Sequence, residues 1–329
     1  MAMGQAQVSS GLSLFSETVL HKLMANNWDM RCLRTNATLP HDAWIAIDKT
    51  MVEVAQRRLI GVADLQGRGL TRELGGLGVL YDIWQKQSSP SVAEQSMSGI
   101  TSGANNTFDY TEVMVPIPIT HIDFSIDARK LSAMQLYGTP IDTTQVSDAA
   151  TKVVDKIEDM LFNGSTVVAG GHSILGYTNY THSNEVACTG NWTGTVANIE
   201  LDVRKLIAAN EADLHFGPYI LYVAKKEWND LRARDSTAGG ITYLEILKSL
   251  AGIADVKVTG VLAAGYIALV EMASETIDMS VGVDIMTVEW PTHGGMQSNF
   301  KVFAAMAPRV KSDYLNQCGV AYDTNLGQS

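Results

Sequence analysis

The sequence predicts an α+β fold, and three observations lead to that class. Residues 143–163 carry the periodicity of one long amphipathic helix. Residues 63–107 are rich in Gly, Ser, Gln and Asn and lack helical periodicity of any length. Residues 196–290 alternate between helical and strand-like patterns. Such a chain combines a helix-backed region, an extended segment and a mixed lobe with its own core.

The helix at 143–163 is expected to be the rigid spine of the molecule. Its apolar side chains recur every three or four residues and therefore share one helical face; they are Val146, Ala150, Val153, Ile157 and Leu161. Thr143 or Thr144 can cap the first free N–H groups, and Asn163-Gly164 supplies a left-handed stop. The adjacent carboxylates Glu158 and Asp159 point in different directions on a helix, which favours solvated charges over a working pair.

The chain before the spine begins with a polar arm, residues 1–40. Phe15, Val19 and Leu23 share one side of a short amphipathic piece within this arm. A helix this short needs a neighbour, in its own chain or in another copy, to be stable in water. Residues 41–62 predict a firmer helix, because a proline precedes the region of its cap and apolar residues recur along one side.

The segment 63–107 is expected to be an extended loop. A structureless connection of this length is normally functional or disordered, and a third possibility is a β-ribbon that projects from its own subunit. A cluster of apolar residues favours the ribbon: Leu77, Leu80, Tyr81, Ile83 and Trp84. A projecting ribbon must bury such a stripe on something, and a partner chain is the simplest covering surface.

The residues after this ribbon alternate in a β-like pattern up to Ile126. Pro116 and Pro118 lie in this run and predict an edge strand, because each removes a donor from the hydrogen-bond ladder. A short helix is expected over residues 127–137, and short strands and turns are expected over 165–195. A last apolar strand near the C-terminus is expected to return to the sheet beside the spine.

Composition and charge exclude several classes of protein. The 329-residue chain has a net charge of −11, which argues against a protein that wraps nucleic acid with its whole surface. Basic and acidic residues nearly balance over residues 1–61, so this end either faces a polyanion or simply lacks excess acid. Neither a membrane span nor a signal peptide is evident. Cys32, Cys188 and Cys318 are far apart and are expected to be buried free thiols.

Motifs that carry chemistry are few, and we predict no catalytic, cofactor-binding or metal-binding residues. The nearest match to a nucleophile elbow contains His172 and Ser173, but Leu175 stands where the strained turn needs glycine. The histidines include no pair spaced i, i+4 and no HExxH motif, and no phosphate-binding loop of the GxxxxGK type is present. A soluble hydrolase that uses His172 and Ser173 remains the alternative from another class.

Five motifs in a fixed order carry a family resemblance over residues 41–315. They are WIAIDKTMVEVAQRRLIGVADL, ITHIDFSIDARKL, KVVDKIEDMLFNG, FGPYILYVAKKEWNDL and FKVFAAMAPRV. Together they resemble the major capsid proteins of tailed bacteriophages with the Hong Kong 97 phage fold, and within that family the encapsulin or linocin-like branch. The resemblance implies an N-terminal arm, an extended β-hairpin loop, a peripheral domain that contains the spine, and an α/β axial domain.

Carried over to this chain, the resemblance assigns residues 108–195 and 291–329 to the peripheral domain and 196–290 to the axial domain. Residues 71–104 become the loop that overlaps a neighbouring subunit, with the apolar cluster as its contacts. The axial loop that lines the centre of a capsomer comprises Arg234, Asp235, Ser236, Thr237, Ala238, Gly239 and Gly240. The arm is expected to make contacts or to face the genome through Phe15, Val19, Leu23, Lys22, Arg31 and Arg34.

The function that the resemblance implies is that of a non-enzymatic shell protein. The expected partners are many copies of itself, in hexamers and pentamers of an icosahedral shell, and enclosed double-stranded DNA bound without sequence specificity. A portal and scaffold or decoration proteins are further expected partners, and no membrane is involved. Assembly would take place in the cytoplasm of a bacterial host and yield a virion capsid. The nearby alternative is an encapsulin compartment that encloses a cargo enzyme.

Overall fold

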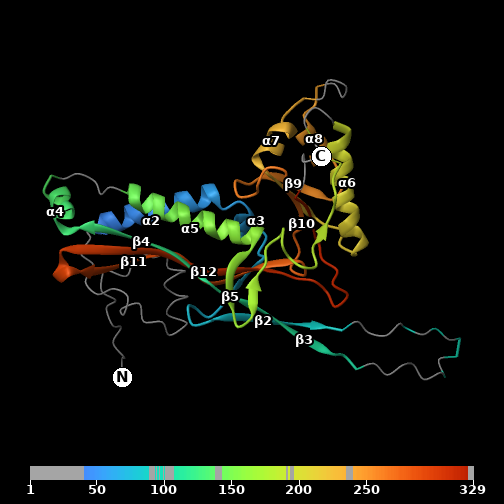
Figure 1. Ribbon diagram of the computed structural model, residues 1–329, viewed down its shortest axis with the longest axis horizontal. Helices are drawn as coiled ribbons and strands as arrows, with labels where there is room; N and C mark the ends of the chain where they lie inside the picture. Colours follow the sequence, from blue (N-terminus) through green and yellow to red (C-terminus); the bar gives the residue numbers. More distant parts are fainter. Residues whose placement is uncertain are drawn as a thin grey trace, which may run out of the picture.

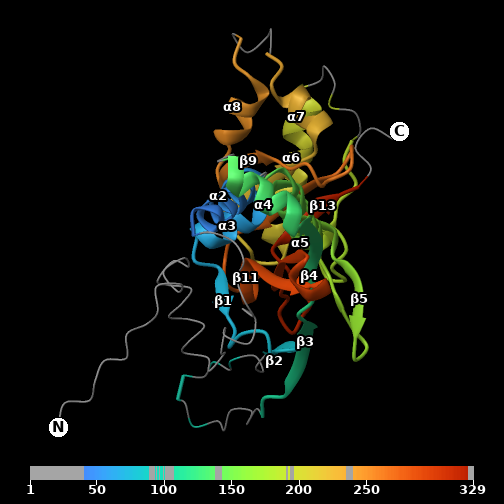
Figure 2. The ribbon, with the colours of Figure 1, turned by 90° about the vertical axis from the view of Figure 1, so that its left-hand side faces the viewer.

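The structure is a computed structural model, and it describes residues 41–88, 93, 95, 97, 98, 100, 107–137, 143–189, 192, 196–234 and 240–324. Two lobes and a projecting hairpin make up this part of the chain (Figure 1). The peripheral lobe is a sheet covered by helices, and the axial lobe stands over one end of it. Seen end-on, the axial lobe, the helices with their sheet, and the hairpin follow one another from top to bottom (Figure 2).

The peripheral lobe is built on a four-stranded sheet with the strand order β1-β11-β12-β4. Its strands are β1 (Thr71–Glu73), β4 (Ile119–Asp127), β11 (Ile277–Thr292) and β12 (Gln297–Val310). β1 runs parallel to β11, whereas the other neighbours are antiparallel. The long strands β11 and β12 are joined by the short turn η2 (His293–Gly295). This pair is the frame that carries both the helices and the hairpin.

The expected edge strand is confirmed, and the prolines divide it in two. Pro116 ends β3 (Tyr110–Pro116), and Pro118 separates it from β4. β4 pairs only with β12 and forms the edge of the four-stranded sheet. β3 instead pairs with β2 (Tyr81–Gln87) in a two-stranded hairpin. The prolines therefore lie where the chain leaves one sheet for another, where no ladder donor is lost.

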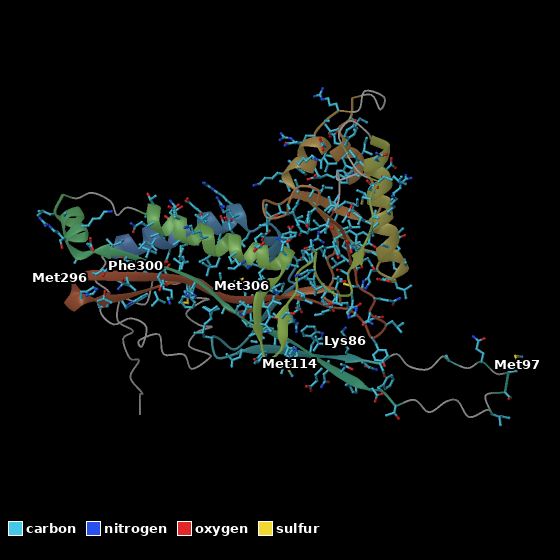
Figure 3. The ribbon with its side chains drawn as sticks, in the orientation of Figure 1. Lys86, Met97, Met114, Met296, Phe300 and Met306 are labelled. Carbon is cyan, nitrogen blue, oxygen red and sulfur yellow. The ribbon has the colours of Figure 1, made fainter. Side chains whose placement is uncertain are left out.

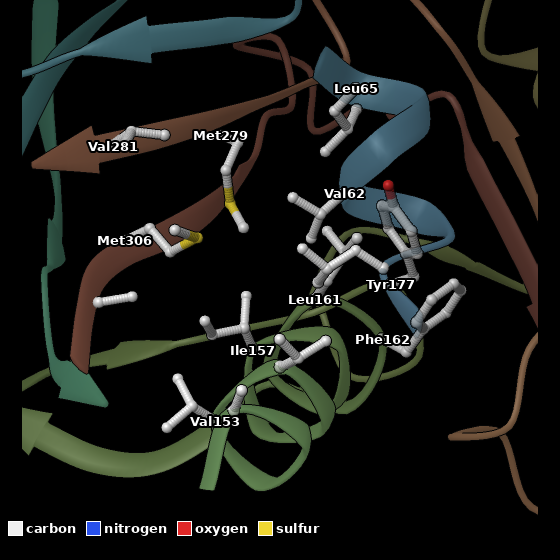
Figure 4. Packing of buried hydrophobic residues seen from close by; sticks show 14 of the residues in the cluster. Val62, Leu65, Val153, Ile157, Leu161, Phe162, Tyr177, Met279, Val281 and Met306 are labelled. Atoms are coloured by element: carbon white, nitrogen blue, oxygen red, sulfur yellow. The ribbon is translucent and has the colours of Figure 1, made fainter. Parts of the chain in front are cut away.

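Helices cover one face of the sheet (Figure 1). They are α2 (His41–Arg58), α3 (Gly61–Gly67), α4 (Ala128–Tyr137) and α5 (Thr144–Asn163). The predicted spine is α5, and all five of its predicted apolar residues are buried. Figure 4 shows Val153, Ile157 and Leu161 of α5 facing Met279 and Met306 of the sheet.

The ends of the spine agree in part with the sequence prediction. Gly164 follows its last residue as expected, but its φ of 74° and ψ of −167° differ from the left-handed helical conformation predicted for the stop. The start differs, because the side chain of Thr143 makes no capping hydrogen bond. The long apolar face, packed on both α2 and the sheet, holds the helix without that cap.

Two other predictions need correction near the spine. The single helix expected over 41–62 is two helices, because α2 ends at Arg58 and α3 begins at Gly61. Glu158 is only 1% exposed and is not a solvated charge. Its carboxylate accepts the backbone N–H of Gly61 at 2.7 Å, that of Ile60 at 3.2 Å and that of Val62 at 3.4 Å. Glu158 thus binds the free N–H groups at the start of α3.

Gly61 allows α3 to approach the spine this closely. A Cβ atom at this position would lie 2.7 Å from Leu161 of the spine.

Burial raises the pKa of Glu158 to about 7, although the three N–H donors lower it.

The axial lobe is a five-stranded sheet with the order β7-β13-β10-β8-β9. Its strands are β7 (Asn184–Glu185), β8 (Tyr219–Val223), β9 (Ile253–Val258), β10 (Ile267–Glu271) and β13 (Val320–Asp323). Its helices are α6 (Val196–Ala212), α7 (Lys225–Leu231) and α8 (Tyr243–Lys248). The central strands β8 and β10 are buried along their whole length, and with these helices they enclose a core of their own. A mixed helical and strand lobe was expected here.

The boundaries between the lobes differ from the sequence prediction. β11 was expected within the axial region 196–290, but from Ile277 onward it belongs to the peripheral sheet. β13 was expected in the peripheral region 291–329, but it lies between β7 and β10 of the axial sheet. Residues 63–107 were expected to form one loop, but α3 and β1 occupy its first part and belong to the peripheral lobe. The expected short strands after the spine are present as β5 (Ser165–Ala169), β6 (His172–Ile174) and β7.

Partly buried polar contacts of Asp64 join the two lobes. Asp64 of α3 accepts the hydroxyl of Tyr222 at 2.8 Å and forms an ion pair with Lys257, both from the axial sheet. Within the axial lobe, the His215 ring is hydrogen-bonded to the carboxylate of Glu271. The Glu271 interaction raises the pKa of His215 against the opposing effect of burial.

Candidate subunit-contact surfaces

The hairpin β2–β3 is the surface that projects farthest from its own lobe (Figures 1 and 3). Side chains of a strand alternate between two faces, and directly opposed residues share a face, as Ile83 and Met114 do. Asp82, Trp84 and Lys86 turn toward the rest of their own chain. We call this the inner face, and the side that carries Ile83 and Met114 the outer face.

The outer face is largely uncovered and mixes apolar with polar side chains. Ile83 is 47% exposed and Tyr110 is 59% exposed. The exposed polar residues that share this face are Gln85, Gln87 and Glu112. Leu80, immediately before β2, is 69% exposed, and Met97, in the connection between the strands, is labelled at the far end of the projection in Figure 3. Exposed apolar side chains of this size on a projecting element are typical of an interaction site.

The inner face is anchored by a buried carboxylate. Asp82 is 3% exposed and accepts the hydroxyl of Ser280 at 2.5 Å. Its other neighbours are two arginines: Arg309 Nη1 lies 2.9 Å and Arg72 Nη1 lies 3.3 Å from its carboxylate oxygens. Ser280 and Arg309 belong to β11 and β12, so this residue ties the hairpin to the long strands of the sheet.

Arg309 is the centre of this anchor. It is 3% exposed, and its Nε donates to Asp278 Oδ1 at 2.6 Å, while a second N–H donates to the other oxygen of the same carboxylate. Lys311 also donates to Asp278, at 2.7 Å. Burial alone would raise the pKa of Asp278, but the bonds from Arg309 and Lys311 outweigh burial and hold that pKa below its usual value. The charges in this cluster are therefore paired and fully formed near neutral pH.

Trp84 differs from the role expected of it. Its ring lies under the Arg309 guanidinium, 5.2 Å from ring centroid to Cζ. Its remaining neighbours belong to the apolar core that underlies the hairpin. Because half of its surface is covered by its own chain, Trp84 helps to hold the hairpin in place. Only the part of the ring that this internal packing leaves exposed is therefore available for the expected contact with a partner.

Lys86 provides the outermost link between the hairpin and its own chain. Its Nζ donates to the Ser312 hydroxyl at 2.5 Å, and Tyr180 lies 2.9 Å from the same hydroxyl. Burial lowers the pKa of Lys86, and the nearby Asp313 opposes that effect. Beyond Lys86 the projection continues away from the lobes (Figure 3).

The remaining predicted loop residues lie at the root of the hairpin. Leu77 is half-buried and packs on the same core as Trp84. Tyr81 is half-buried, and its hydroxyl lies against the β5–β6 turn at Gly170. The structure thus brings Leu77, Tyr81 and Trp84 together at the root and leaves Leu80 and Ile83 as the exposed members of the predicted cluster.

The predicted axial loop is described only at its two ends. Arg234 is exposed and forms a β-bridge with Thr242. Gly240 has a φ of 84°, a conformation that favours glycine. Thr242 caps α8 by accepting the backbone N–H of Glu245 at 3.3 Å. Residues 235–239, which include Asp235, Ser236, Thr237 and Gly239, lie outside the described part of the chain.

The predicted arm contacts also lie outside the described residues; they are Phe15, Val19, Lys22, Leu23, Arg31 and Arg34. Cys32 lies there as well. Of the other two cysteines, Cys318 is buried and Cys188 is half-buried, and both are free thiols. Burial raises the pKa of Cys318 to about 12, as expected of an inert buried thiol.

The sequence candidates for a metal site or a nucleophile are not brought together in the described residues. Within that part of the chain, no three His, Cys, Asp or Glu side chains are grouped as a metal site requires. His172 and Ser173 are adjacent on β6, so their side chains point to opposite faces of the strand and cannot form a nucleophile–base pair. Among the described helices, none is both long and apolar enough to cross a membrane.

The sequence prediction missed Arg309, Asp82 and Asp278. One signal was available, because Arg309 interrupts the apolar run FAAMAPRV, and an arginine in a buried strand requires a buried acidic partner. The identity of that partner could not be read from the sequence, because Asp82 lies in a distant segment. Glu158 gave no such signal, because acidic residues are common on helices.

Comparisons with known proteins bear on this geometry. The sequence profile of a family of unknown function (DUF6260) matches residues 34–323. The type 1 encapsulin shell protein EncA of Myxococcus xanthus (strain DK1622) is 25% identical over 286 residues, which cover 83% of this chain and 90% of that protein.

Solved structures of similar shape come from capsids and capsid-like particles. The capsid of Myoviridae phage XM1 is similar with a TM-score of 0.64 and 13% identity, over 81% of this chain and 92% of that one. The virus-like particle from Pyrococcus furiosus has a TM-score of 0.57 and 15% identity, over 84% and 97% of the two chains. The capsid of a native GTA particle has a TM-score of 0.56 and 12% identity, over 99% and 100%. These likenesses confirm the predicted fold, which is the Hong Kong 97 phage fold.

Proposed function

The chain belongs to the family of unknown function DUF6260, and on that premise and its fold we propose that it is a shell-forming subunit, the major capsid protein of a tailed bacteriophage. The observation that carries this proposal is the hairpin β2–β3. Its inner face is bound to its own subunit by paired charges, whereas its outer face exposes Ile83 and Tyr110, and Leu80 is exposed immediately before β2. A rigid projection with an uncovered apolar face is suited to overlap a neighbouring copy.

The assembly would be driven by repetition. Each copy contributes one overlap and receives another, so the contact is heterologous and closes into rings of five or six subunits. Each contact can be weak, because every copy is held by several neighbours at once, and weak contacts let misplaced subunits leave before closure. The paired charges at the hairpin root serve this mechanism by presenting every hairpin at the same angle.

The other partners follow from the same proposal. The axial loop, residues 234–240, lines the centre of each hexamer or pentamer, and the arm, residues 1–40, makes contacts or faces the genome through Lys22, Arg31 and Arg34. The shell encloses double-stranded DNA without sequence specificity. It is completed by a portal, with scaffold or decoration proteins, in the cytoplasm of the bacterial host.

A second candidate is an encapsulin shell that encloses a cargo enzyme. The observation that favours it is the 25% identity to the encapsulin EncA, which extends over most of both chains. Both candidates share the shell and the role of the hairpin, and they differ in what the shell contains.

The role of the hairpin is tested by replacing Ile83 with Asp. This change places a charge on the outer face without touching the inner-face ion pairs, so the subunit should fold but fail to form shells. Gln87→Asp is the matched control, because it adds the same charge on the same strand and face without removing apolar surface. Sedimentation velocity and electron microscopy measure the particles, and normal shells from Ile83→Asp would rule out the hairpin as the overlap.

The content of the shell separates the two candidates. Particles purified from cells that make the intact chain should be compared by absorbance at 260 and 280 nm and by a protein gel. Packaged double-stranded DNA is the result expected of a phage capsid, whereas one co-purifying enzyme and little nucleic acid would favour the compartment.

A further inference from the structure

Beneath the axial lobe, two adjoining loops expose large apolar side chains. Leu214 and Phe216, between α6 and β8, are 69% and 67% exposed. Tyr314 and Leu315, between β12 and β13, are 49% and 63% exposed. We infer that these four residues, here called the junction patch, are a contact surface for a second copy of this chain. The inference rests on the proposed shell function and adds a second surface to it.

The junction patch stands on a fixed support. Asp213 accepts the side-chain N–H of Asn184 at 2.8 Å and the backbone N–H of Cys318 at 3.2 Å, which ties the two loops together. Asp313 closes the second loop by accepting the backbone N–H of Gln317 at 2.7 Å. Both loops are therefore held by hydrogen bonds, of which those to Asp213 are partly buried, and their apolar side chains are exposed on a constrained backbone.

Leu214 strengthens this argument. Its φ is 64°, in the left-handed region that a leucine rarely adopts. This conformation closes the C-terminus of α6, where the N–H of His215 donates to the carbonyl of Asn210 at 3.0 Å. The end of the helix thus fixes the backbone at Leu214 and leaves its apolar side chain uncovered, which gains nothing in the isolated subunit.

The place of the patch indicates which molecule covers it. Ser312, two residues before Tyr314, bonds to Lys86 on the inner face of β2 at 2.5 Å. The patch therefore borders the hairpin where it leaves its own lobes (Figure 3). A copy that lies along the projecting hairpin must also approach the loops above its root, so the two surfaces are continuous.

The charges around the patch indicate the matching surface. Glu211 and Glu275, beside the two loops, are exposed and acidic. The opposite end of the molecule has the complementary character: Arg129 of α4 is exposed, with Leu136 at 80% and Met296 at 73% exposure. Met296 accepts the backbone N–H of Ala128 at 2.9 Å, so α4 and the β11–β12 turn form one surface. We call it the distal patch, and Figure 3 labels Met296 at that end.

An acidic-rimmed apolar patch at one end and a basic-rimmed one at the other fit a head-to-tail contact. Such a contact is heterologous and agrees with rings of subunits. Its occupant is therefore the distal patch of a second copy, which lies alongside the hairpin of the first.

The test uses the full chain with Phe216→Ser and Leu315→Ser combined. These side chains are exposed, so circular dichroism and the thermal midpoint should be unchanged, while the yield of shells at equal concentration should fall about tenfold or more. The matched control is Val168→Ser on β5, which removes a side chain that is 63% exposed elsewhere on the molecule. Shell yield equal to that of the unchanged chain would overturn the inference.

The pairing with the distal patch is tested by charge reversal. Glu211→Arg alone should reduce shell yield, and adding Arg129→Glu should restore it. Failure of the second change to restore assembly would overturn the distal patch as the occupant.

These outcomes remain distinct from failure of the proposed function. If the unchanged chain forms no shells, the proposed function is wrong. If Ile83→Asp blocks assembly while the junction-patch variant assembles normally, the shell function stands and the junction patch is not a contact.

Discussion

The two faces of the hairpin β2–β3 differ in their contacts: the inner face binds its own subunit, whereas the outer face is exposed. The inner face holds Asp82 against Arg309 and stacks Trp84 on the same guanidinium, all within one subunit. The outer face exposes the side chains of Ile83 and Tyr110 beside polar residues and Glu112, and it has no buried ion pair. Buried ion pairs require strict geometry, whereas apolar contacts tolerate small displacements. The comparison indicates that the direction of the projection is fixed inside the subunit, and that its contact with a neighbour remains adaptable.

The largest expected effect comes from removing the centre of the inner face. Arg309→Ala leaves Asp82 and Asp278 buried without their shared partner, which should lower the free energy of unfolding by about 3 to 5 kcal/mol. Guanidinium unfolding of the soluble Ile83→Asp subunit, with and without Arg309→Ala, measures this difference. Replacement of exposed Arg204 by Ala on α6 is the control and should change stability by less than about 0.5 kcal/mol. Equal effects would show that the inner face is not the anchor.

The next largest effect is a pH dependence of stability that should come from Glu158 of the spine and not from the inner face of the hairpin. Glu158 has a pKa of about 7 in the folded chain and near 4.5 when unfolded. Between these values the folded chain holds a proton that the unfolded chain has lost, so raising the pH through this window should lower stability by about 2 to 3 kcal/mol. The lowered pKa of Asp278 keeps it ionised throughout the window, so the hairpin root contributes no such slope.

Glu158→Gln should therefore reduce the slope, and Arg309→Ala should retain it. The raised pKa of His215 contributes a slope of the same sign, which remains in Glu158→Gln. Unfolding curves at several pH values between about 5 and 8 make the measurement. A slope in Glu158→Gln equal to that of the unchanged chain would assign the titration to another group.

Trp84→Ala is expected to have an intermediate effect. Part of the ring is already exposed, so the lost packing on Arg309 should cost roughly 2 kcal/mol, less than for a fully buried tryptophan. Hydrogen exchange of the β2–β3 amides should then rise, because the hairpin has lost part of its support. Unchanged hydrogen exchange would show that the stacking of Trp84 on Arg309 does not help to hold the hairpin. Because this variant affects both fold and contact, it is a poorer probe of assembly than Ile83→Asp.

The smallest effect on stability belongs to the outer face. Ile83→Asp should change the free energy of unfolding of the subunit by no more than about 1 kcal/mol, because nearly half of the residue is already exposed to water. Its effect should appear in assembly alone. Large destabilisation by Ile83→Asp would mean that the outer face also packs within the subunit and would remove the contrast between the two faces.

Local patterns allowed the sequence to predict the spine, the edge strand and the general order of the parts. The apolar residues of α5 recur every three or four positions within one segment, and Pro116 and Pro118 affect only the strand pairing of their own segment, so both signals are local in the sequence. The errors concern long-range pairing. The alternation of β11 identifies a strand but not the sheet that it joins, and Glu158 binds N–H groups of a distant helix. The exposed part of the predicted contact cluster was visible in the sequence, whereas its anchor required Arg309 and Asp82 to be brought together in space.

The position of β13 has a consequence for synthesis of the protein. This strand, residues 320–323, lies between β7 and β10, although the rest of the axial sheet is contributed by residues before 272. While the ribosome is still making the chain, the ladder between β7 and β10 therefore stays open until residues 320–323 have emerged. A chain that stops before residue 320 lacks an internal strand of this sheet. Synthesis of residues 320–323 is thus a condition for a finished axial lobe, and a copy without them cannot present the same surface to a neighbouring copy.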